Sequence, residues 1–272
     1  MPPKLGIIAG GGELPVRLAS ACLEQGREAF LLGLRGHADP ADFPADLPQA
    51  WIRMGEVGKG FDILHRNKVV ELVMAGPVRR PALSELRPDW RTVRFFAKLG
   101  MRALGDDGLL KALMAEIEAE GFHVVGAHSI LGELLAEPGN WGRQAPDELA
   151  RADIARGLEV AKGLGALDVG QSVVVQQGIV LGVEAVEGTD ALLRRAGELR
   201  RDGPGGVLVK ICKPGQDRRA DLPTVGPETV RKAAAAGLRG IAVEAGSTIV
   251  LSREALIAEA DTAKLFVCGI GL

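Results

Sequence analysis

The sequence predicts a two-domain α/β protein, in which a domain with a parallel sheet is followed by a domain with a mixed sheet. In the first half of the 272-residue chain, short apolar strand patterns alternate with amphipathic helix patterns. The second half contains hairpin patterns as well as strand–helix crossovers. Between the halves, residues 126–146 are rich in Gly, Pro and small polar residues, which is typical of a boundary. We therefore expect domains over residues 1–132 and 133–272.

The expected strands of the first half are apolar and short. They lie at Leu5–Ala9, Ala29–Leu34, Gln49–Arg53, Val69–Ala75 and His123–Val125. Helices are expected between them at Leu14–Glu24, Gly58–Asn67, Arg91–Leu99 and Asp107–Glu120. Apolar strands that alternate with helices are typical of a parallel sheet covered on both faces, so a Rossmann-like domain is predicted.

The second half begins with a helix expected from Asp147 to about Gly163. Further helices are expected at Asp190–Gly197, Pro227–Ala236 and Arg253–Thr262. Strands are expected at Ser172–Gln176, Ile179–Glu184, Val207–Cys212, Gly240–Val243, Thr248–Leu251 and Leu265–Cys268. Gln177-Gly178 is expected to close a hairpin between the first two strands, and residues 244–247 a second hairpin. The predicted architecture is a mixed α/β domain.

The composition excludes several classes of protein. The formal net charge of −2 argues against a nucleic-acid binder, and an aromatic content of 4% without tyrosine is poor for base stacking. Cys22, Cys212 and Cys268 form no C-x-x-C pair, so we expect reduced structural thiols in a cytoplasmic protein. The chain shows no signal peptide pattern and no run of about 18 apolar residues that would span a bilayer.

The most informative stretch is KICKPGQDRRADLPTVG, from Lys210 to Gly226. An apolar strand leads into a stretch with four cations and two carboxylates, in which Pro214 and Pro223 restrict the backbone. Cations bind phosphate oxygens, and a carboxylate can bind a divalent metal or accept a proton from water. The stretch therefore suits a metal-assisted phosphate site, although a solvated salt-bridged loop would have the same composition.

A second informative stretch is the turn Gly10-Gly11-Gly12, which follows the first strand and precedes a helix. Glycines at this position allow a ligand to approach the backbone, and the helix offers amides to an anion. The dinucleotide fingerprint does not fit, because its third glycine falls on Pro15 and the second strand is followed by Arg35. The turn indicates a nucleotide or phosphate site, or a tight turn without a ligand. A nicotinamide-dependent oxidoreductase is disfavoured.

Other residues also suit ligand binding. Glu184, Glu187 and Asp190 follow a strand and supply oxygens suited to Mg²⁺ or a sugar, whereas Thr189 or Asp190 alternatively caps the next helix. Arg79 and Arg80 follow a buried strand, where open α/β sheets place their ligands, and could equally be surface cations. The four histidines lack the spacing of a zinc site.

Five segments, taken in order, resemble one family. They are IAGGGELPV, AGPVRRP, GAHSILGELL, LDVGQSVVVQQGIVLGVEAVEGTD and KPGQDRRADLPTVGPET. Together they resemble the LpxI family, UDP-2,3-diacylglucosamine diphosphatases of lipid A assembly in some Gram-negative bacteria. The resemblance extends from Leu5 to about Val267 and implies an amino-terminal lid, a carboxy-terminal catalytic domain and a substrate between them.

The resemblance also implies the chemistry. The family hydrolyses the diphosphate of UDP-2,3-diacylglucosamine to lipid X and UMP with Mg²⁺, or with another divalent ion such as Mn²⁺ or Co²⁺. The essential aspartate of its D-x-P-T-[IV]-G motif falls on Asp221, as metal ligand or general base. Lys213 is a catalytic candidate that would clamp phosphate.

The substrate-binding candidates are Gly10, Gly11, Gly12, Arg79, Arg80, Gln171, Glu184, Thr189, Asp190 and Arg218, with Arg219 as a second clamp. We expect transient contact with the inner face of the inner membrane, and a homodimer is possible. The alternative is a non-catalytic nucleotide-binding regulatory module.

Overall fold

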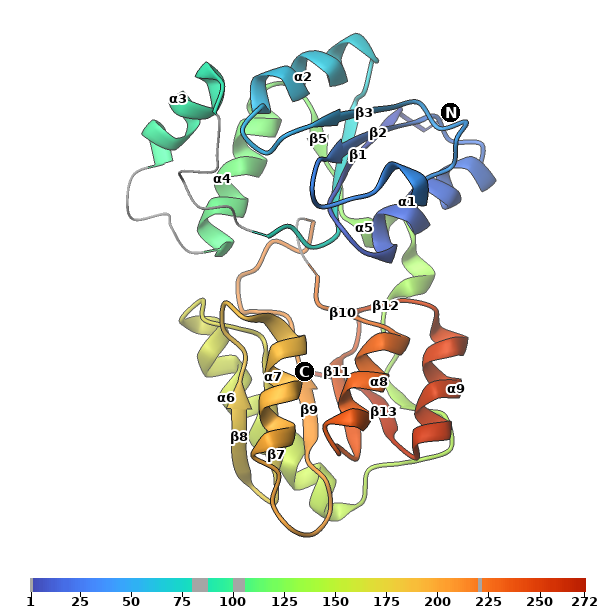
Figure 1. Cartoon of the computed structure of the whole chain (residues 1–272), viewed down its shortest axis with the longest axis vertical. Coiled ribbons are helices and arrows are strands. Elements are labelled where there is room, and N and C mark those ends of the chain that lie inside the picture. The colour runs from blue at the N-terminus through green and yellow to red at the C-terminus, as the bar shows by residue number, and fades with distance from the viewer. Residues whose placement is uncertain (1, 80–87, 100–105, 220–221) are drawn as a thin grey trace. The chain divides into compact units, whose positions relative to one another are not determined.

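A computed structural model describes residues 2–79, 88–99, 106–219 and 222–272 (Figure 1). Contacts divide the chain into two units, each with its own sheet. The first comprises Met1–Gly132 together with Asp217–Asp221, and the second comprises Glu133–Gln216 and Leu222–Leu272. The segment Asp217–Asp221 therefore belongs by its contacts to the first unit, although its neighbours in the chain belong to the second.

The first unit contains a five-stranded parallel sheet in the order β3-β2-β1-β4-β5. Its strands are β1 (Leu5–Ala9), β2 (Ala29–Leu34), β3 (Gln49–Ile52), β4 (Glu71–Ala75) and β5 (His123–Val124). The predicted Rossmann-like parallel sheet is confirmed. The strand order reverses between β1 and β4, and open α/β sheets bind ligands beyond the carboxyl ends of the strands at such a point.

Helices cover both faces of this sheet. They are α1 (Glu13–Glu24), α2 (Val57–Arg66), α3 (Trp90–Leu99), α4 (Asp106–Ala119) and the short α5 (Ala127–Ile130), with a 3-10 turn at Pro40–Asp42. Figure 1 shows α1 and α5 on one face and α2 and α4 on the other. Phe61 and Leu64 of α2 and Ile117 of α4 share one apolar core with Leu32 and Leu72 of the sheet. Burial is nearly continuous along β1 and β2, so both faces of the sheet require a cover of helices.

The second unit contains a six-stranded mixed sheet in the order β6-β13-β11-β9-β7-β8. Its strands are β6 (Gly139–Trp141), β7 (Ser172–Gln176), β8 (Ile179–Val183), β9 (Val207–Lys210), β11 (Gly240–Glu244) and β13 (Phe266–Ile270). Strands β9, β11 and β13 are parallel, whereas β6, β7 and β8 pair antiparallel with their neighbours. The predicted mixed α/β architecture is confirmed.

The helices of the second unit also pack on both faces of their sheet. They are α6 (Glu148–Ala166), α7 (Gly188–Glu198), α8 (Pro227–Ala235) and α9 (Arg253–Ala263). Val207 and Val209 of β9 face a core that includes Ala150 and Ala161 of α6. Leu208 faces the opposite core, which contains side chains of α7, α8 and α9. One strand therefore supplies both cores, as expected for a strand buried on both sides.

The hairpin predicted at Gln177-Gly178 is confirmed. Both residues have positive φ, 52° and 77°, as the tight turns of hairpins require. The buried Asp153 of α6 accepts hydrogen bonds from the Gln177 amide at 3.1 Å and the Gly178 amide at 2.7 Å. A carboxylate from the neighbouring helix therefore fixes the turn.

The second predicted hairpin, over residues 240–251, is wrong. Strand β11 lies between β9 and β13 and is parallel to both, while β12 (Ile249–Val250) pairs in parallel with β10 (Thr224–Val225) as a separate two-stranded sheet. The connecting residues bond elsewhere: the amide of Ala245 donates to the carbonyl of Ile270, and that of Gly246 to the carbonyl of Ala136. A short apolar run cannot by itself reveal whether its neighbours are parallel. Strands β6 and β10 were not predicted.

Within the described ranges, no helix combines the length and apolar composition needed to cross a membrane. Cys22, Cys212 and Cys268 all lie in these ranges as buried thiols without disulfides. Burial raises the pKa of Cys268 to about 11 and also raises that of Cys22. Their burial agrees with the predicted structural role, and their reduced state stays a prediction.

Candidate functional site

Polar residues gather at one edge of the second sheet, where β9 and β11 reach their carboxyl ends. Register places Ser172, the first residue of β7, beside Lys210, the last residue of β9. Glu184 follows directly after β8, and its amide donates to the carbonyl of Ser172 at 2.8 Å. Glu244 ends β11. These four buried polar residues, Ser172, Glu184, Lys210 and Glu244, define what we call the second-sheet edge.

Lys210 is the central cation of the second-sheet edge, and its side chain is only 7% exposed. Its Nζ donates to the Thr189 hydroxyl at 3.0 Å and to the carbonyl of Thr224 at 3.2 Å. A buried ammonium needs such partners because its desolvation is costly. Lys210 thereby links two sequence segments, VEGTD and DLPTVG, which the sequence analysis treated separately.

Glu184 is the carboxylate of the same network. Thr189 accepts from Lys210 and donates to Glu184 Oε1 at 2.7 Å, so one hydroxyl connects a cation to an anion. The backbone N–H of Gln171 also donates to Glu184, with 3.4 Å between the nitrogen and Oε2. Among the described residues, the buried Oε1 of Gln171 has no hydrogen-bond partner. Because buried acceptors are normally satisfied, this oxygen is suited to a ligand or a water.

Glu244 fixes the start of the cationic loop. Its carboxylate accepts from the Cys212 amide at 2.9 Å, two residues beyond the end of β9. The Gln216 side chain then accepts from the Cys212 thiol at 3.3 Å and from the Lys213 amide at 3.0 Å. Residues 212–216 are therefore held by side-chain contacts from both sides, which positions Lys213.

Lys213 lies in an ion pair. Its Nζ is 2.8 Å from Oδ1 of Asp168, and its side chain is mostly buried. The backbone of the loop also packs on α6, since a Cβ placed on Gly165 would lie 2.7 Å from Cδ of Pro214. To hold a phosphate, Lys213 would have to share its ammonium between Asp168 and the ligand. A lysine has three donors, so the geometry permits this.

The three carboxylates suggested for Mg²⁺ point to different partners. Glu187 pairs with Arg195 at 2.7 Å, Asp190 pairs with Lys232 at 2.5 Å, and Glu184 bonds Thr189. Within the part of the chain that the structure describes, no three His, Cys, Asp or Glu side chains are grouped closely enough to hold a metal. The described residues therefore do not form a metal centre by themselves. Glu187 is the N-cap of α7, so Thr189 and Asp190 lie inside its first turn and neither is the cap.

The segment that carries Arg218 and Arg219 has its contacts in the first unit. Arg219 makes a two-point contact with Asp217, at 3.0 and 2.8 Å, and its third bond reaches Glu118 of α4 at 2.8 Å. The Arg219 guanidinium lowers the pKa of Asp217, and these carboxylates raise the pKa of Arg219. Arg219 therefore anchors the segment, while the adjacent Arg218 is exposed.

The glycine turn lies at the carboxyl edge of the first sheet, which we call the first-sheet edge. The amides of Gly10 and Gly11 donate to the carbonyls of Ala75 and Pro77 at 2.8 and 3.0 Å. A Cβ on Gly10 would lie 2.6 Å from the Gly76 oxygen, so these glycines allow two loops to pack closely. Two of the three amides predicted to face a nucleotide thus already bond the chain itself.

Arg79 also lies at the first-sheet edge. Its amide donates to Nδ1 of His37 at 3.3 Å and its side chain is exposed. Arg80 and Asp221 lie outside the described residues. The remaining predicted residues divide between the units: Gly10, Gly11, Gly12, Arg79 and Arg218 belong to the first, and Gln171, Glu184, Thr189, Asp190 and Lys213 to the second.

Sequence reasoning did not select several members of the second-sheet edge as site residues, although Lys210 begins the cationic stretch that it singled out. They are Ser172, Lys210 and Glu244, together with Asp168, the partner of Lys213. For two of them the sequence did contain a signal. Lys210 and Glu244 are charged residues that each end an apolar strand, VLVK and GIAVE. A charged residue at the end of a strand buried on both faces must find partners at the sheet edge. Nothing in the local sequence of Ser172 or Asp168 marks them.

The fold and this edge define a class: a two-unit α/β protein whose second sheet carries a buried cation–carboxylate network. Models of the LpxI N-terminal and C-terminal domains match residues 4–134 and 137–268. A relative from Caulobacter vibrioides, named UDP-2,3-diacylglucosamine pyrophosphatase LpxI, is 46% identical over 98% of this chain and 97% of its own. The chain belongs to the LpxI family, and the resemblance seen in the sequence is confirmed.

Solved structures are similar only at a low level. A CobK precorrin-6A reductase gives a TM-score of 0.34 at 18% identity, covering 99% of this chain and 88% of its own. A Thermus thermophilus UDP-glucose 4-epimerase in complex with NAD gives a TM-score of 0.32 at 12% identity, covering 98% and 86%. Similarities of this size carry no argument about function.

Proposed function

We propose that this chain hydrolyses the diphosphate bond of UDP-2,3-diacylglucosamine to give lipid X and UMP, as a step in lipid A synthesis. The observation that carries the proposal is its 46% identity, over nearly its whole length, to a relative named as the pyrophosphatase for this substrate. The second-sheet edge supports it independently, because its buried cation Lys210 and the mostly buried Lys213 in the loop that follows suit an anionic substrate.

The proposed reaction is attack of water on the phosphorus next to the glucosamine. The water oxygen forms a bond to this phosphorus, the bond from phosphorus to the bridging oxygen breaks, and UMP leaves with that oxygen. Asp221 of the DLPTVG motif is our candidate to take the proton from water or to bind a metal. Reaction in ¹⁸O-labelled water should label lipid X and leave UMP unlabelled, whereas label in UMP would mean attack on the other phosphorus.

Side chains at the second-sheet edge and next to it would hold the reacting group. We propose that Lys213 neutralises a nonbridging phosphate oxygen and that Gln171, Glu184 and Thr189 orient the sugar or phosphate by hydrogen bonds. A positioned donor such as Lys213 stabilises charge that develops in the transition state, and removal of such a donor typically lowers kcat by about 10²–10³-fold. Lys210, whose ammonium donates to the Thr189 hydroxyl, would supply fixed positive charge next to these side chains.

We further propose that turnover requires a divalent metal, with Asp221 as the one ligand that the family motif offers. When bound, such an ion supplies positive charge at the phosphate oxygens and lowers the pKa of bound water. A chelator should abolish activity and added Mg²⁺, Mn²⁺ or Co²⁺ should restore it. Full activity in chelator would refute the metal requirement without refuting the hydrolase.

The direct test is hydrolysis of UDP-2,3-diacylglucosamine by the wild type and by Asp221→Ala, with lipid X and UMP resolved. We expect turnover in the wild type and none in the variant, with unchanged thermal unfolding. Turnover that persists in Asp221→Ala would mean that another carboxylate binds the metal or takes the proton from water. Uridine nucleotide binding without turnover in the wild type would indicate a regulatory module instead.

A further inference from the structure

Helix α3, Trp90–Leu99, has an exposed face of unusual composition. Trp90 is 77% exposed and Val93 is 43% exposed, and Arg94 and Ala97 are exposed beside them. These four residues are spaced i, i+3, i+4 and i+7, so they form one strip along the helix. The chain has only three tryptophans, and of the other two Trp141 is buried and Trp51 is half-buried. Trp90 is therefore the exposed tryptophan of the chain, and it lies in one strip with a second exposed apolar side chain, Val93.

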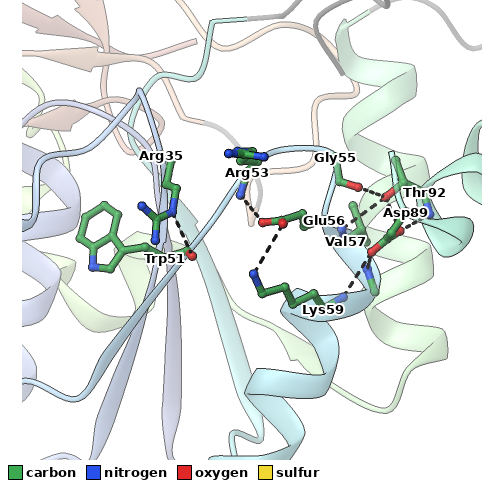
Figure 2. A network of polar contacts seen from close by, with 10 residues as sticks. Arg35, Trp51, Arg53, Gly55, Glu56, Val57, Lys59, Asp89 and Thr92 are labelled. Carbon is green, nitrogen blue, oxygen red and sulfur yellow. Dashed lines mark hydrogen bonds and ion pairs between the residues drawn. The ribbon is translucent and has the colours of Figure 1, made fainter. Parts of the chain in front are cut away.

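The opposite face of α3 is fixed to the first unit. Thr92 and Phe95 are buried, and the Thr92 hydroxyl donates to the carbonyl of Gly55 at 2.8 Å. Asp89, immediately before the helix, accepts from the amides of Gly58 at 2.8 Å and Lys59 at 3.3 Å, at the start of α2 (Figure 2). This contact sets the orientation of α3, so that Trp90 and Val93 face away from the core of their unit.

The charge of α3 indicates which kind of surface could bind to it. The helix contains three basic residues, Arg91, Arg94 and Lys98, and no acidic one, in a chain whose net charge is −2. Arg91 is engaged with Glu120 at 3.2 Å, whereas Arg94 lies in the exposed strip. Two copies of the chain related by a twofold axis would bring like charges together if they met through this strip. A negatively charged surface fits better.

We propose that the strip Trp90, Val93, Arg94 and Ala97 of α3 is a docking site for the surface of an anionic bilayer. Tryptophan favours the membrane interface, where its ring is buried and its N–H stays hydrated, and Arg94 would pair with lipid headgroups. The proposal rests on the proposed function, since a substrate with two acyl chains has to be taken from a membrane. It adds the element through which the protein reaches that membrane.

Vesicle binding by the whole chain tests the proposal. Vesicles of phosphatidylglycerol and phosphatidylethanolamine should bind the wild type, and binding should weaken with added salt. Trp90→Ala should weaken it about tenfold, as expected for loss of one large apolar side chain from the interface. Arg94→Ser should weaken it about fivefold, the effect of one basic residue near an anionic surface.

Matched controls separate this strip from general surface properties. Leu23→Ser removes another partly exposed apolar side chain of the first unit, on α1, and Arg143→Ser removes an exposed cation of the second unit. Both should bind vesicles like the wild type. Lipids with brominated acyl chains should quench tryptophan emission in the wild type, and the quenching should be lost in Trp90→Ala, which retains Trp51 and Trp141.

Three results would overturn the proposal. The first is an absence of wild-type binding to anionic vesicles, and the second is equal binding by Trp90→Ala, Arg94→Ser and the controls. The third is a dimer in sedimentation equilibrium that Trp90→Ala dissociates while vesicle binding is unchanged, which would assign the strip to a second copy. Hydrolysis of substrate dispersed in detergent micelles separates the two proposals. If the wild type does not hydrolyse the substrate in micelles, the proposed function is refuted. The role of α3 in membrane binding is decided by the vesicle measurements alone.

Discussion

The carboxyl edges of the two sheets differ in what occupies them, although apolar strands lead to both. At the first-sheet edge the chain's own backbone fills the space, because the amides of Gly10 and Gly11 bond carbonyls of β4 and the loop after it. At the second-sheet edge, buried charged side chains meet: Lys210, Glu184 and Glu244. A glycine turn thus indicates a close approach of backbone, and the partner in that approach can be the chain itself.

The same difference appears at the helix N-termini of the first unit. The start of α2 is capped by Asp89, and the first turn of α1 carries Glu13, so each holds a negative group of the protein. At α2 a phosphate would have to compete with Asp89 for the helix amides, and at α1 it would meet the negative charge of Glu13. The second-sheet edge, in contrast, offers the buried ammonium of Lys210 with that of Lys213 next to it, and the unsatisfied Gln171 Oε1 could accept from a sugar hydroxyl. The comparison therefore favours the second-sheet edge as the place where substrate charge is bound.

The largest effect is expected for Lys210→Met. The variant keeps the length of the side chain but leaves the buried Glu184 and Thr189 without their cation, and breaking a buried ionic network typically costs about 3–5 kcal/mol. Urea unfolding should show this loss. Lys162→Met, on the exposed face of α6, is the matched control and should change stability by less than about 0.5 kcal/mol. A small loss of unfolding free energy in Lys210→Met would mean that water reaches the network and solvates its charges.

Gly10→Ala should have the next largest effect, at the first-sheet edge. The added Cβ would lie 2.6 Å from the Gly76 oxygen and 2.7 Å from the Pro77 oxygen, and both are backbone atoms that cannot rotate away. We expect a loss of about 1–3 kcal/mol, as for overpacked cores. Gly163→Ala is the same substitution in helix α6, where a Cβ meets nothing within 4 Å, and should stabilise by about 0.5–1 kcal/mol. Equal effects at both positions would contradict the packing role of Gly10.

Asp89→Asn tests the cap on α2 and should cost about 1 kcal/mol. Burial alone would raise the pKa of Asp89, but hydrogen bonds from Thr92, Lys59 and Gly58 lower it overall. A lowered folded pKa gives stability that is present above the unfolded value of about 4 and is lost as the pH falls through the folded value. The difference in unfolding free energy between wild type and Asp89→Asn should therefore shrink below about pH 4. A constant difference would exclude the carboxylate as its source.

The smallest effect on stability is expected for Asp190→Ala. Its pair with Lys232 lies on the surface, and such pairs contribute about 0–1 kcal/mol. Any large loss of turnover in this variant would therefore report contact with substrate rather than unfolding. Unchanged turnover, measured together with thermal unfolding, would remove Asp190 from the substrate-binding candidates.

The strands and helices of the first unit were predictable because each has a regular period and a clear end. Even the hairpin at Gln177-Gly178 followed from local turn chemistry. The pairing of β11 was not predictable, because a short buried strand has the same pattern in a parallel or an antiparallel position. Glu184 and Thr189 were identified from local composition, but their link to Lys210 spans 21 residues from Thr189 and depends on the sheet register. Sequence patterns identify residue types, whereas long-range pairing decides which of them meet.

The central claim is that the network around Lys210 at the second-sheet edge serves catalysis. Thr189→Val tests it most directly, because the substitution keeps the shape of the side chain and removes the hydroxyl that joins Lys210 to Glu184. The measurement is kcat for UDP-2,3-diacylglucosamine in wild type and variant, at a temperature where both are folded. We predict a fall of at least about tenfold, smaller than the roughly 10²–10³-fold effect of a donor aimed at the transition state, because the Thr189 hydroxyl donates to Glu184. A kcat equal to that of the wild type would contradict the claim and place the chemistry elsewhere in the chain.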